Sequence, residues 1–555
     1  MYAKSWDRYT IDQTLTSHIQ ESSDLVAAPA GTPGSLTVTG GSDRVLPGTY
    51  TCRANVAADG SLAANAACVP IDWFSASTLE GNIPNNLQDW LQTPVTGRTY
   101  YEQITGELDV DGDLFQLPAG PLGFALGAVL RHDKLDDEPS IYAQEGDLYN
   151  YSSAGITKGT DLVYEFYGEL HIPLLKDKPF FQDLEATASG RYTHYRSYGA
   201  DTTYKVSGIW GPTTFLKFRG AYGTSFRAPN LYEQNVGDQT GFYGAESDPC
   251  SDYQNQALPS SNLYKNCKTA LSATKVGTAN FNPNGGPEEI SEGGKGLLKA
   301  ETSTSLTYGL VLQPKFANLS FAVDYYRIVV KNEVTQLGTD ILNFCYDAPD
   351  FSSNFYCSLI QPRNTQTGNL TTFLNPFINV AHQSTSGIDF TARYGLPIGA
   401  GTFNASVEAT RVLSQKYQEF AGDTVYEYNG TLGNADFAGG PKWTGEAELL
   451  YKIHLLTFNY GLQYVGPMDS DKLDGVNPAV DPYDLRTGKY FEHSISVQYN
   501  ASNGVQVTFG VRNFTDAKPE VVSVGASVPR LGNYFDYSGY DFIGRSLFTE
   551  IVKKF

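Results

Sequence analysis

Short segments that alternate between apolar and polar residues recur along the chain. In one of them Leu456, Phe458 and Tyr460 fall on one face, and Thr457 and Asn459 fall on the other. A period of two with one apolar face indicates β-strands whose second face is polar. Comparable alternation, sometimes with charges on the polar face, occurs at 216–222, 319–326 and 505–512.

The connections between these segments alternate in length. Short turns are expected near 117–121, 175–179, 210–212, 313–315, 394–397, 452–454 and 500–503. Long polar segments lie near 133–160, 224–303, 331–384, 413–439, 466–488 and 515–541, and only the short connection near 196–204 breaks the alternation. Tight turns at one end and long loops at the other are typical of transmembrane β-barrels. A β-sandwich of this length would be expected to divide into domains at linkers, and none is visible.

The last segment, 539–555, alternates in the same way and ends on Phe555. Leu547, Thr549 and Ile551 share the face of Phe555, whereas Glu550 lies on the opposite face. The alternation of loop lengths places this end on the side of the short turns. We therefore expect a barrel-closing strand whose terminus, Phe555, lies at the periplasmic face.

Composition narrows the classes of protein that fit. The chain has 555 residues, 37 Tyr, 30 Phe and only 2 Met, and aromatic residues form the interfacial girdles of barrels. No stretch approaches the roughly 18 apolar residues of a spanning helix. The net charge of −21 argues against general nucleic-acid binding. It would suit an acidic vestibule, or divalent cations that bridge acidic loops to lipopolysaccharide phosphates, and plain solubility explains it equally well.

The six cysteines form three close pairs in segments rich in Gly, Ser, Asn and Pro. The pairs are Cys52 and Cys68, Cys250 and Cys267, and Cys345 and Cys357. Local disulfides in exposed loops are the simplest interpretation and imply an oxidising compartment, with six free thiols as the alternative. An exported protein needs a signal peptide and none is visible, so we expect the chain to be incomplete at its N-terminus.

A set of motifs in a fixed order resembles TonB-dependent receptors, the ligand-gated transporters of the Gram-negative outer membrane. The segment 223–233 carries Phe226, Arg227, Ala228 and Pro229; 510–519 carries Asn513 and Phe514; and 540–545 carries Gly544 and Arg545. Further matching segments are 68–71, 117–127, 298–305, 309–314, 324–332 and 386–390. The ordered set covers nearly the whole chain.

The resemblance implies an all-β fold, a transmembrane antiparallel outer-membrane β-barrel with long extracellular loops. Family barrels have 22 strands, and we count about 17 or 18 strand candidates here. The N-terminal plug domain and the TonB box of the family are not visible. We therefore predict that 1–555 is an incomplete barrel domain, without the plug and the first strands. Alone, such a chain is expected neither to close fully nor to transport, because an unpaired strand edge in lipid is costly.

The function implied is energy-coupled uptake of a scarce nutrient, such as a ferric siderophore or a carbohydrate. The alternatives are a passive porin-like pore and a non-transporting truncated receptor or adhesin surface. The expected partners are the lipid bilayer, lipopolysaccharide, a plug domain, TonB and a small nutrient ligand, but no nucleic acid. A monomer that crosses the outer membrane many times is expected, with no enzymatic activity, cofactor or metal.

Candidate sites are few. Arg227 could contact plug or ligand, but a structural ion pair is favoured, as it is for Arg512 and Arg545. Aromatic residues of the long loops could stack on a ligand or pack on each other. The two interpretations are equally supported for Phe242, Tyr243, Phe344, Phe351, Phe355 and Tyr356.

Three other segments are interpreted as structural elements and not as binding sites. The segment 109–113 resembles the start of a calcium loop but lacks its final Glu, so a hairpin turn is favoured. The acidic stretch 133–138 is predicted to be a solvated loop. A helix is predicted at Ser77–Gln92, as a loop packing element rather than a ligand contact.

Overall fold

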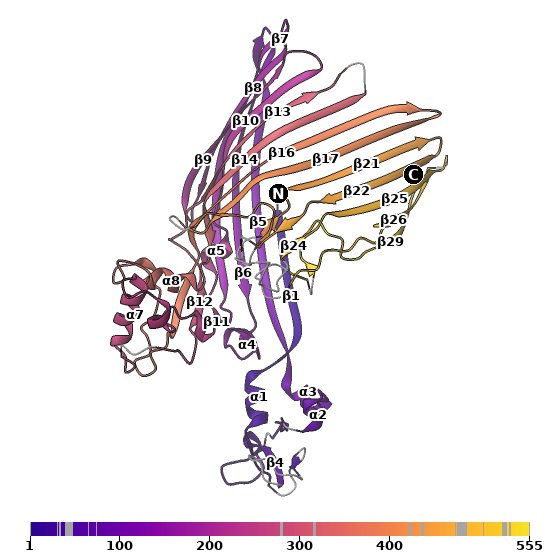
Figure 1. Cartoon of the computed structure of the whole chain (residues 1–555). Coiled ribbons are helices and arrows are strands. Elements are labelled where there is room, and N and C mark those ends of the chain that lie inside the picture. Colours follow the sequence, from indigo (N-terminus) through magenta and orange to yellow (C-terminus); the bar gives the residue numbers. More distant parts are fainter. Residues whose placement is uncertain are drawn as a thin grey trace.

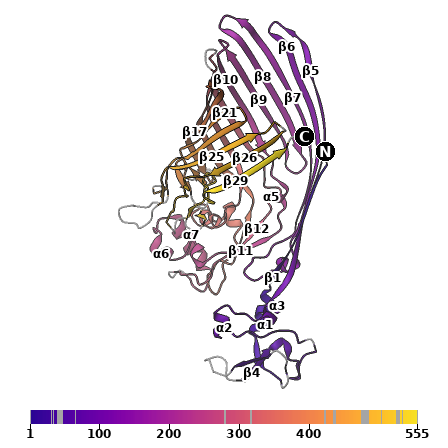
Figure 2. The same cartoon turned by 90° about the vertical axis from the view of Figure 1, so that its right-hand side faces the viewer.

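One large antiparallel sheet dominates the computed structural model (Figures 1 and 2). The structure describes residues 2–29, 32, 35–38, 48–64, 66–73, 75–277, 281–314, 318–420, 424–433, 438–471, 473, 485–502, 504–523, 530–531 and 534–553. Within them the main sheet has 17 strands, in agreement with the predicted 17 or 18 and with the all-β fold class.

The long strands pair antiparallel, each with the next in the sequence. They are β1 (Tyr2–Thr14), β5 (Gln92–Leu117), β6 (Gly120–Glu138), β7 (Thr157–Lys178), β8 (Phe181–Tyr195), β9 (Gly199–Gly211), β10 (Leu216–Arg227), β13 (Glu301–Leu312), β14 (Leu319–Thr335), β16 (Ile378–Ile398), β17 (Gly401–Gln418), β21 (Trp443–Ile453), β22 (Leu456–Val465), β25 (Tyr490–Asn500), β26 (Val505–Arg512) and β29 (Ser546–Lys553). The short β18 (Tyr426–Glu427) adds to β17.

The predicted alternation of short and long connections is confirmed, including its exception between β8 and β9. Helices and small sheets gather at the end of the long connections, which is the lower end in Figure 1. They include α4 (Ile141–Gln144), β19 (Thr431–Gly433), β20 (Ala438–Gly440), β23 (Met468–Asp469), β24 (Arg486–Thr487), β27 (Arg530–Leu531) and β28 (Tyr534–Phe535). Of the helices in the described ranges, none is long and apolar enough to cross a membrane.

The two faces of the strands differ in chemistry. Along β5 and β6, Leu108, Leu126 and Leu130 point to one side and are more than half exposed. Glu107 and Arg131 point to the other side. Because a broad exposed apolar band is unfavourable in water, the first side suits lipid and the second suits an aqueous interior.

Two predicted loops are strands instead. The segment 109–113 lies inside β5 and pairs with 123–127 of β6, so the predicted hairpin turn is wrong. The acidic stretch 133–138 lies in β6 between β5 and β7, so the predicted loop is wrong too. In 109–113 the three carboxylates lie on the aqueous face. In 133–138 charges lie on both faces, which water can cover beyond the lipid, so they do not prevent pairing.

The sheet is open within the described residues. β1 pairs with β5, and β29 pairs with β26. In the part of the chain that the structure describes, β1 and β29 do not pair with each other. Phe555 lies outside the described residues, so its role as the closing terminus stays a prediction, as does the single barrel domain 1–555.

A small lobe stands between β1 and β5. It contains α1 (Thr16–Ser23), β2 (Leu25–Ala27), β3 (Leu36–Val38), β4 (Gly48–Cys52), η1 (Arg53–Asn55), α2 (Ala76–Leu79) and α3 (Asn85–Leu91). The single helix predicted at Ser77–Gln92 is wrong, because Gly81 adopts a φ of +80° and Pro84 precedes α3. Leu87 and Leu91 of α3 pack with Ile71, which confirms a packing role for that part.

At four positions in the described strands, a glycine lies directly opposite an aromatic residue whose ring covers it. The pairs are Gly97 with Tyr9, Gly127 with Tyr167, Gly387 with Tyr326, and Gly510 with Phe548. A Cβ added at any of these glycines would meet the opposing ring within 2.6 Å. The ring therefore covers the backbone that the glycine leaves bare.

We expect Gly387→Ala to lower the stability of the protein. Its Cβ would lie 2.5 Å from the Tyr326 hydroxyl oxygen and 2.8 Å from the backbone oxygen of Arg411. Such overpacking costs about 1–3 kcal/mol. The thermal unfolding midpoint in detergent should fall. Gly106→Ala is the matched control, since nothing lies within 4 Å of its Cβ; equal midpoints for the two variants would contradict the interpretation.

Candidate functional site

Two of the long outer loops fold together into a cap. The first, between β10 and β13, contains α5 (Leu231–Asn235), β11 (Gln239–Phe242), η2 (Ala245–Ser247), α6 (Tyr253–Gln256), α7 (Asn262–Ser272) and β12 (Glu288–Glu292). The second, between β14 and β16, contains α8 (Asp340–Tyr346), α9 (Phe355–Ser358) and β15 (Thr372–Pro376). β12 pairs with β11 of its own loop and, in parallel, with β15 of the other loop. We call the segments 228–300 and 336–377 the loop cap.

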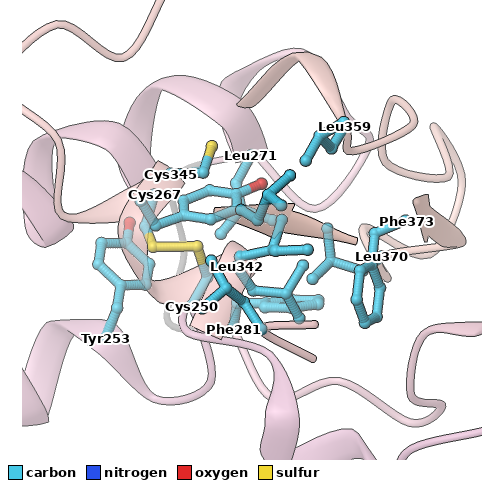
Figure 3. Packing of buried hydrophobic residues seen from close by; sticks show 14 residues of the cluster. Cys250, Tyr253, Cys267, Leu271, Phe281, Leu342, Cys345, Leu359, Leu370 and Phe373 are labelled. Atoms are coloured by element: carbon cyan, nitrogen blue, oxygen red, sulfur yellow. A yellow bond between two sulfur atoms is a disulfide. The ribbon is translucent and has the colours of Figure 1, made fainter. Parts of the chain in front are cut away.

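The loop cap has its own hydrophobic core (Figure 3). Its buried members come from both loops and include Leu271, Phe281, Ile341, Leu342, Leu370 and Phe373. The predicted disulfides Cys250–Cys267 and Cys345–Cys357 lie in this core, one in each loop. The third predicted disulfide, Cys52–Cys68, lies in the small lobe. All three predicted pairs are thus present.

A buried ion pair joins the two loops. The Arg363 guanidinium donates from Nη1 to Asp248 Oδ2 at 2.6 Å and from Nη2 to Asp248 Oδ1 at 2.7 Å. The two side chains are 4% and 1% exposed. Arg363 also donates to the Tyr346 hydroxyl and to the carbonyl of Gly368, and its guanidinium lies 4.9 Å from the centre of the Tyr346 ring. This satisfies a charge that would otherwise be costly to bury.

The titration of this group follows from its contacts. Burial opposes the charged form, but the hydrogen bonds from Arg363 to Asp248 keep the pKa of the guanidinium above its ordinary value. Burial also raises the pKa of the Tyr346 hydroxyl, although Arg363 acts in the opposite direction. The Arg363 guanidinium therefore stays charged near neutral pH and holds the two loops together.

A second polar cluster surrounds the buried Glu289. Its carboxylate accepts hydrogen bonds from Tyr243 Oη at 2.6 Å, from Ser291 Oγ at 2.6 Å and from Asn375 Nδ2 at 2.7 Å. Burial and the bond to Glu289 raise the pKa of Tyr243 to about 12. Tyr243 was a candidate for stacking on a ligand. In the structure its hydroxyl donates a hydrogen bond to Glu289 of β12, within the loop cap.

The other candidate aromatics divide into two groups. Phe344 lies 5.1 Å from the Tyr356 ring and 4.1 Å from Phe420, while Phe351 packs on Tyr346. These contacts agree with mutual packing. Phe242 is 73% exposed and Phe355 is 47% exposed, although Phe355 also touches Tyr356. A role in ligand binding stays a prediction for all of them.

Arg227 marks the point where β10 passes into the loop cap. It donates from Nη1 to Glu233 at 2.8 Å and from Nε to Glu301 of β13 at 2.7 Å. Glu233 and Asn230 form the capping box of α5, which fixes the direction of the loop just after Ala228 and Pro229. Phe226 lies edge-on to Tyr195. The contacts of Arg227 agree with the structural ion pair, and its contact with a plug or ligand stays a prediction.

The C-terminal motif residues shape the last long loop. Asn513 is fully buried and bonds the backbone of Ala517 and the side chain of Asp541. The Arg545 backbone N–H donates to Asp516 next to Gly544, whose φ is +81°. Phe514 lies beside His493, and Arg512 lies over Phe548. Among the side chains that the structure describes, no carboxylate lies within ion-pair distance of Arg512. All of these contacts are made within the last long loop and the strands beside it.

Sequence reasoning missed an acidic column on the inner face of β5. Glu107, Asp109, Asp111 and Asp113 follow one another at the strand period and point to the aqueous side. The hydroxyl of Tyr167 donates to Glu107 and Asp109. Their spacing by two residues was the signal available in the sequence. No group of three or more metal-ligating side chains comes together among the described residues.

Comparison with known proteins gives a family and a fold. The family model described as TonB dependent receptor-like, beta-barrel, matches residues 6–514. A variant of the ferric enterobactin receptor of Pseudomonas aeruginosa, in complex with enterobactin, superposes with a TM-score of 0.53 at 15% identity, over 84% of this chain and 55% of that chain. The siderophore receptor PirA of Acinetobacter baumannii gives 0.52 at 16%, over 83% and 55%.

At these identities the two receptors show a shared fold. The chain spans about half the length of either one. No curated protein sequence matches it.

We expect Arg363→Met to loosen the loop cap. Removing one partner of a buried pair leaves Asp248 uncompensated and costs about 3–5 kcal/mol. Hydrogen exchange of backbone amides in 228–300 and 336–377 should become faster by about 100-fold or more, since 1.4 kcal/mol is tenfold. Mass spectrometry after exchange measures this directly.

The matched control is Arg393→Met, whose partner Glu408 is 60% exposed and whose ion pair contributes little. The double variant Arg363→Met with Asp248→Leu should exchange more slowly than the single variant, because no buried charge remains unpaired. Equal exchange in the Arg363 and Arg393 variants would contradict the assignment of a clamp.

Proposed function

Because this chain belongs to the TonB-dependent receptor-like β-barrel family, we propose that it forms the wall and the outer capture surface of an energy-coupled outer-membrane transporter. The match over residues 6–514 supports this proposal across nearly the whole chain. We assign no catalytic role, since the family consists of transporters. The proposed location is the Gram-negative outer membrane, which the chain crosses many times as a monomer.

The observation that carries the proposal is the loop cap. It is a packed unit at the end of the long connections, held by a hydrophobic core, two disulfides and the Arg363–Asp248 pair. A surface that is ordered before a ligand arrives loses less conformational entropy on binding. Loops placed by a rigid sheet are also where binding residues concentrate.

The proposed substrate is a scarce nutrient such as a ferric siderophore or a carbohydrate. The two structural neighbours are siderophore receptors, and one of them holds enterobactin, which supports the first class. A plug domain and TonB are the proposed partners for transport. Lipid and lipopolysaccharide are the proposed surroundings of the apolar face.

A second candidate is a truncated receptor or adhesin surface that does not transport. This candidate keeps the loop cap as its capture surface, with the same core, disulfides and Arg363–Asp248 pair, and loses the transport cycle.

Uptake depends on TonB under this proposal. Cells that produce this chain together with the plug and TonB box of its family should accumulate one member of a panel of labelled ferric siderophores and oligosaccharides. Deletion of TonB should reduce that uptake to background, while cells that produce 1–555 alone should stay at background. Uptake that is unchanged without TonB, together with a large single-channel conductance, would instead establish a passive pore.

The exposed aromatics of the loop cap should contribute to binding. Phe242→Ala and Phe355→Ala are each expected to weaken the ligand found in the uptake panel by about 0.5–1.5 kcal/mol, or about two- to tenfold in Kd, through lost stacking. Titration with the labelled ligand in nanodiscs measures this. The exposed Phe180, at a short turn of the opposite end, is the matched control; equal losses in Phe180→Ala would argue against a site on the loop cap.

A further inference from the structure

A groove opens on the loop cap between its helices. α8 packs on both α7 and α9, and Figure 1 shows α7 on the side of the loop cap that lies away from the long strands. The groove has a volume of about 650 Å³, and small-molecule sites have about 300–1,000 Å³. We call it the helix groove, and it is lined by residues within 269–274, 345–346, 351–358 and 360–365.

The walls of the helix groove are held in place by covalent and ionic contacts. Cys345 of α8 and Cys357 of α9 line it and form a disulfide. Arg363 lines it too, and its guanidinium is held by Asp248 of the other loop. A site that is fixed before its ligand arrives loses less conformational entropy on binding. The helix groove therefore rests on the same contacts that hold the two loops together.

Part of the lining is apolar. It includes Ala270 and Ala273 at the C-terminal end of α7, together with Phe351 and Ile360. The Phe351 ring packs on the Tyr346 ring, with 5.3 Å between the two ring centres. Because this contact fixes the position of Phe351, its ring offers a flat apolar surface to the C–H groups of a ligand.

The rest of the lining is mostly neutral and polar, and it offers mainly hydrogen-bond acceptors. In Thr269, Thr274 and Ser358 the hydroxyl donates its only hydrogen to a nearby backbone carbonyl, at 2.8, 2.7 and 2.6 Å. The oxygen lone pairs of these hydroxyls stay open to a donor from a ligand. The Gln361 side chain is exposed and has no hydrogen-bond partner among the described residues. Its amide can therefore both donate and accept.

The charge of the lining limits the ligands that fit. The chain has 60 acidic and 39 basic side chains, yet Arg363 is the only charged residue among the described residues that line the helix groove. Its guanidinium is already paired with Asp248. An anionic ligand would find no uncommitted cation in this lining, and a cationic ligand would find no carboxylate. A fully apolar ligand would leave the polar groups with neither water nor a partner, which is unfavourable.

We propose that the helix groove binds a neutral oligosaccharide. Sugar hydroxyls can donate to the open oxygens of Thr269, Thr274 and Ser358, and they can both donate to and accept from Gln361. The C–H groups of a sugar ring fit against Phe351. A peptide backbone carries as many carbonyls as N–H groups, and its carbonyls would find few donors in this lining. The inference rests on the proposed function, because it assigns one class of ligand to the capture surface.

The test uses the full chain, extracted in a detergent without a sugar head group and applied to an array of neutral and acidic oligosaccharides. The wild type should bind at least one neutral oligosaccharide and none of the acidic ones. Thr269→Trp places a large ring in the helix groove and should weaken that binding by at least about tenfold. Gln361→Ala should weaken it by about two- to tenfold through lost hydrogen bonds. The matched control is Ser272→Trp, on the exposed surface of the same helix but outside the lining, and it should bind like the wild type.

The other outcomes separate the possibilities. A wild type that binds no neutral oligosaccharide would overturn the inference and leave TonB-dependent uptake, measured separately in cells, untouched. Equal binding by Thr269→Trp and Ser272→Trp, with wild-type circular dichroism, would overturn it too. Displacement of the oligosaccharide by a pool of uncharged hexapeptides would show a peptide site and overturn it. Oligosaccharide binding that is lost in Thr269→Trp, in a protein whose cells show no TonB-dependent uptake, would support the helix groove and overturn the proposed transport.

Discussion

Backbone hydrogen bonding between neighbouring strands is the constraint on which the rest of the molecule depends. In hydrocarbon no water can satisfy a backbone N–H or C=O, so each spanning strand must be paired along its length. The continuous registers from β1 to β29 meet that demand everywhere except at the two outer edges of the sheet. They also fix the positions from which the loops start. Arg227 connects the last residue of β10 to Glu301 of β13, where the strand pairing ends. It also bonds Glu233 and so fixes where the loop cap begins.

The loop cap follows a different principle, because water surrounds it and its backbone can bond to solvent. What gives it one structure is a core shared by two loops, closed by local disulfides and by a salt bridge across them. Its two loops start from neighbouring hairpins, since β13 and β14 pair directly. Short distances between loop ends reduce the entropy lost when the loops associate. The buried Arg363–Asp248 pair makes that association specific, because both charged groups are satisfied only when the two loops pack in this arrangement.

Local features could be predicted from the sequence, and long-range ones could not. Strand faces, loop parity and the three disulfides depend on residues that are close in sequence. The helix at Ser77–Gln92 was predicted too long, although Gly81 and Pro84 were visible signals of its interruption. The stretch 109–113 was misread although its carboxylates all lie on the aqueous face of β5. The stretch 133–138 was misread because a strand beyond the bilayer has water on both faces and loses the apolar signature. Arg363 and Asp248 are 115 residues apart, and no local pattern indicates that their loops meet.

The strand period also explains why the net charge of the chain says little about its partners. A single strand presents opposite chemistry on its two faces, because successive side chains point in opposite directions. β5 carries Glu107 and Asp109 toward the aqueous side, and Tyr100 and Arg98 toward the outside. The net charge of the chain adds these two faces together and so describes neither of them. The sign of the field that a lipid or a solute meets is therefore decided by parity and height along the strand, and the total of −21 predicts neither.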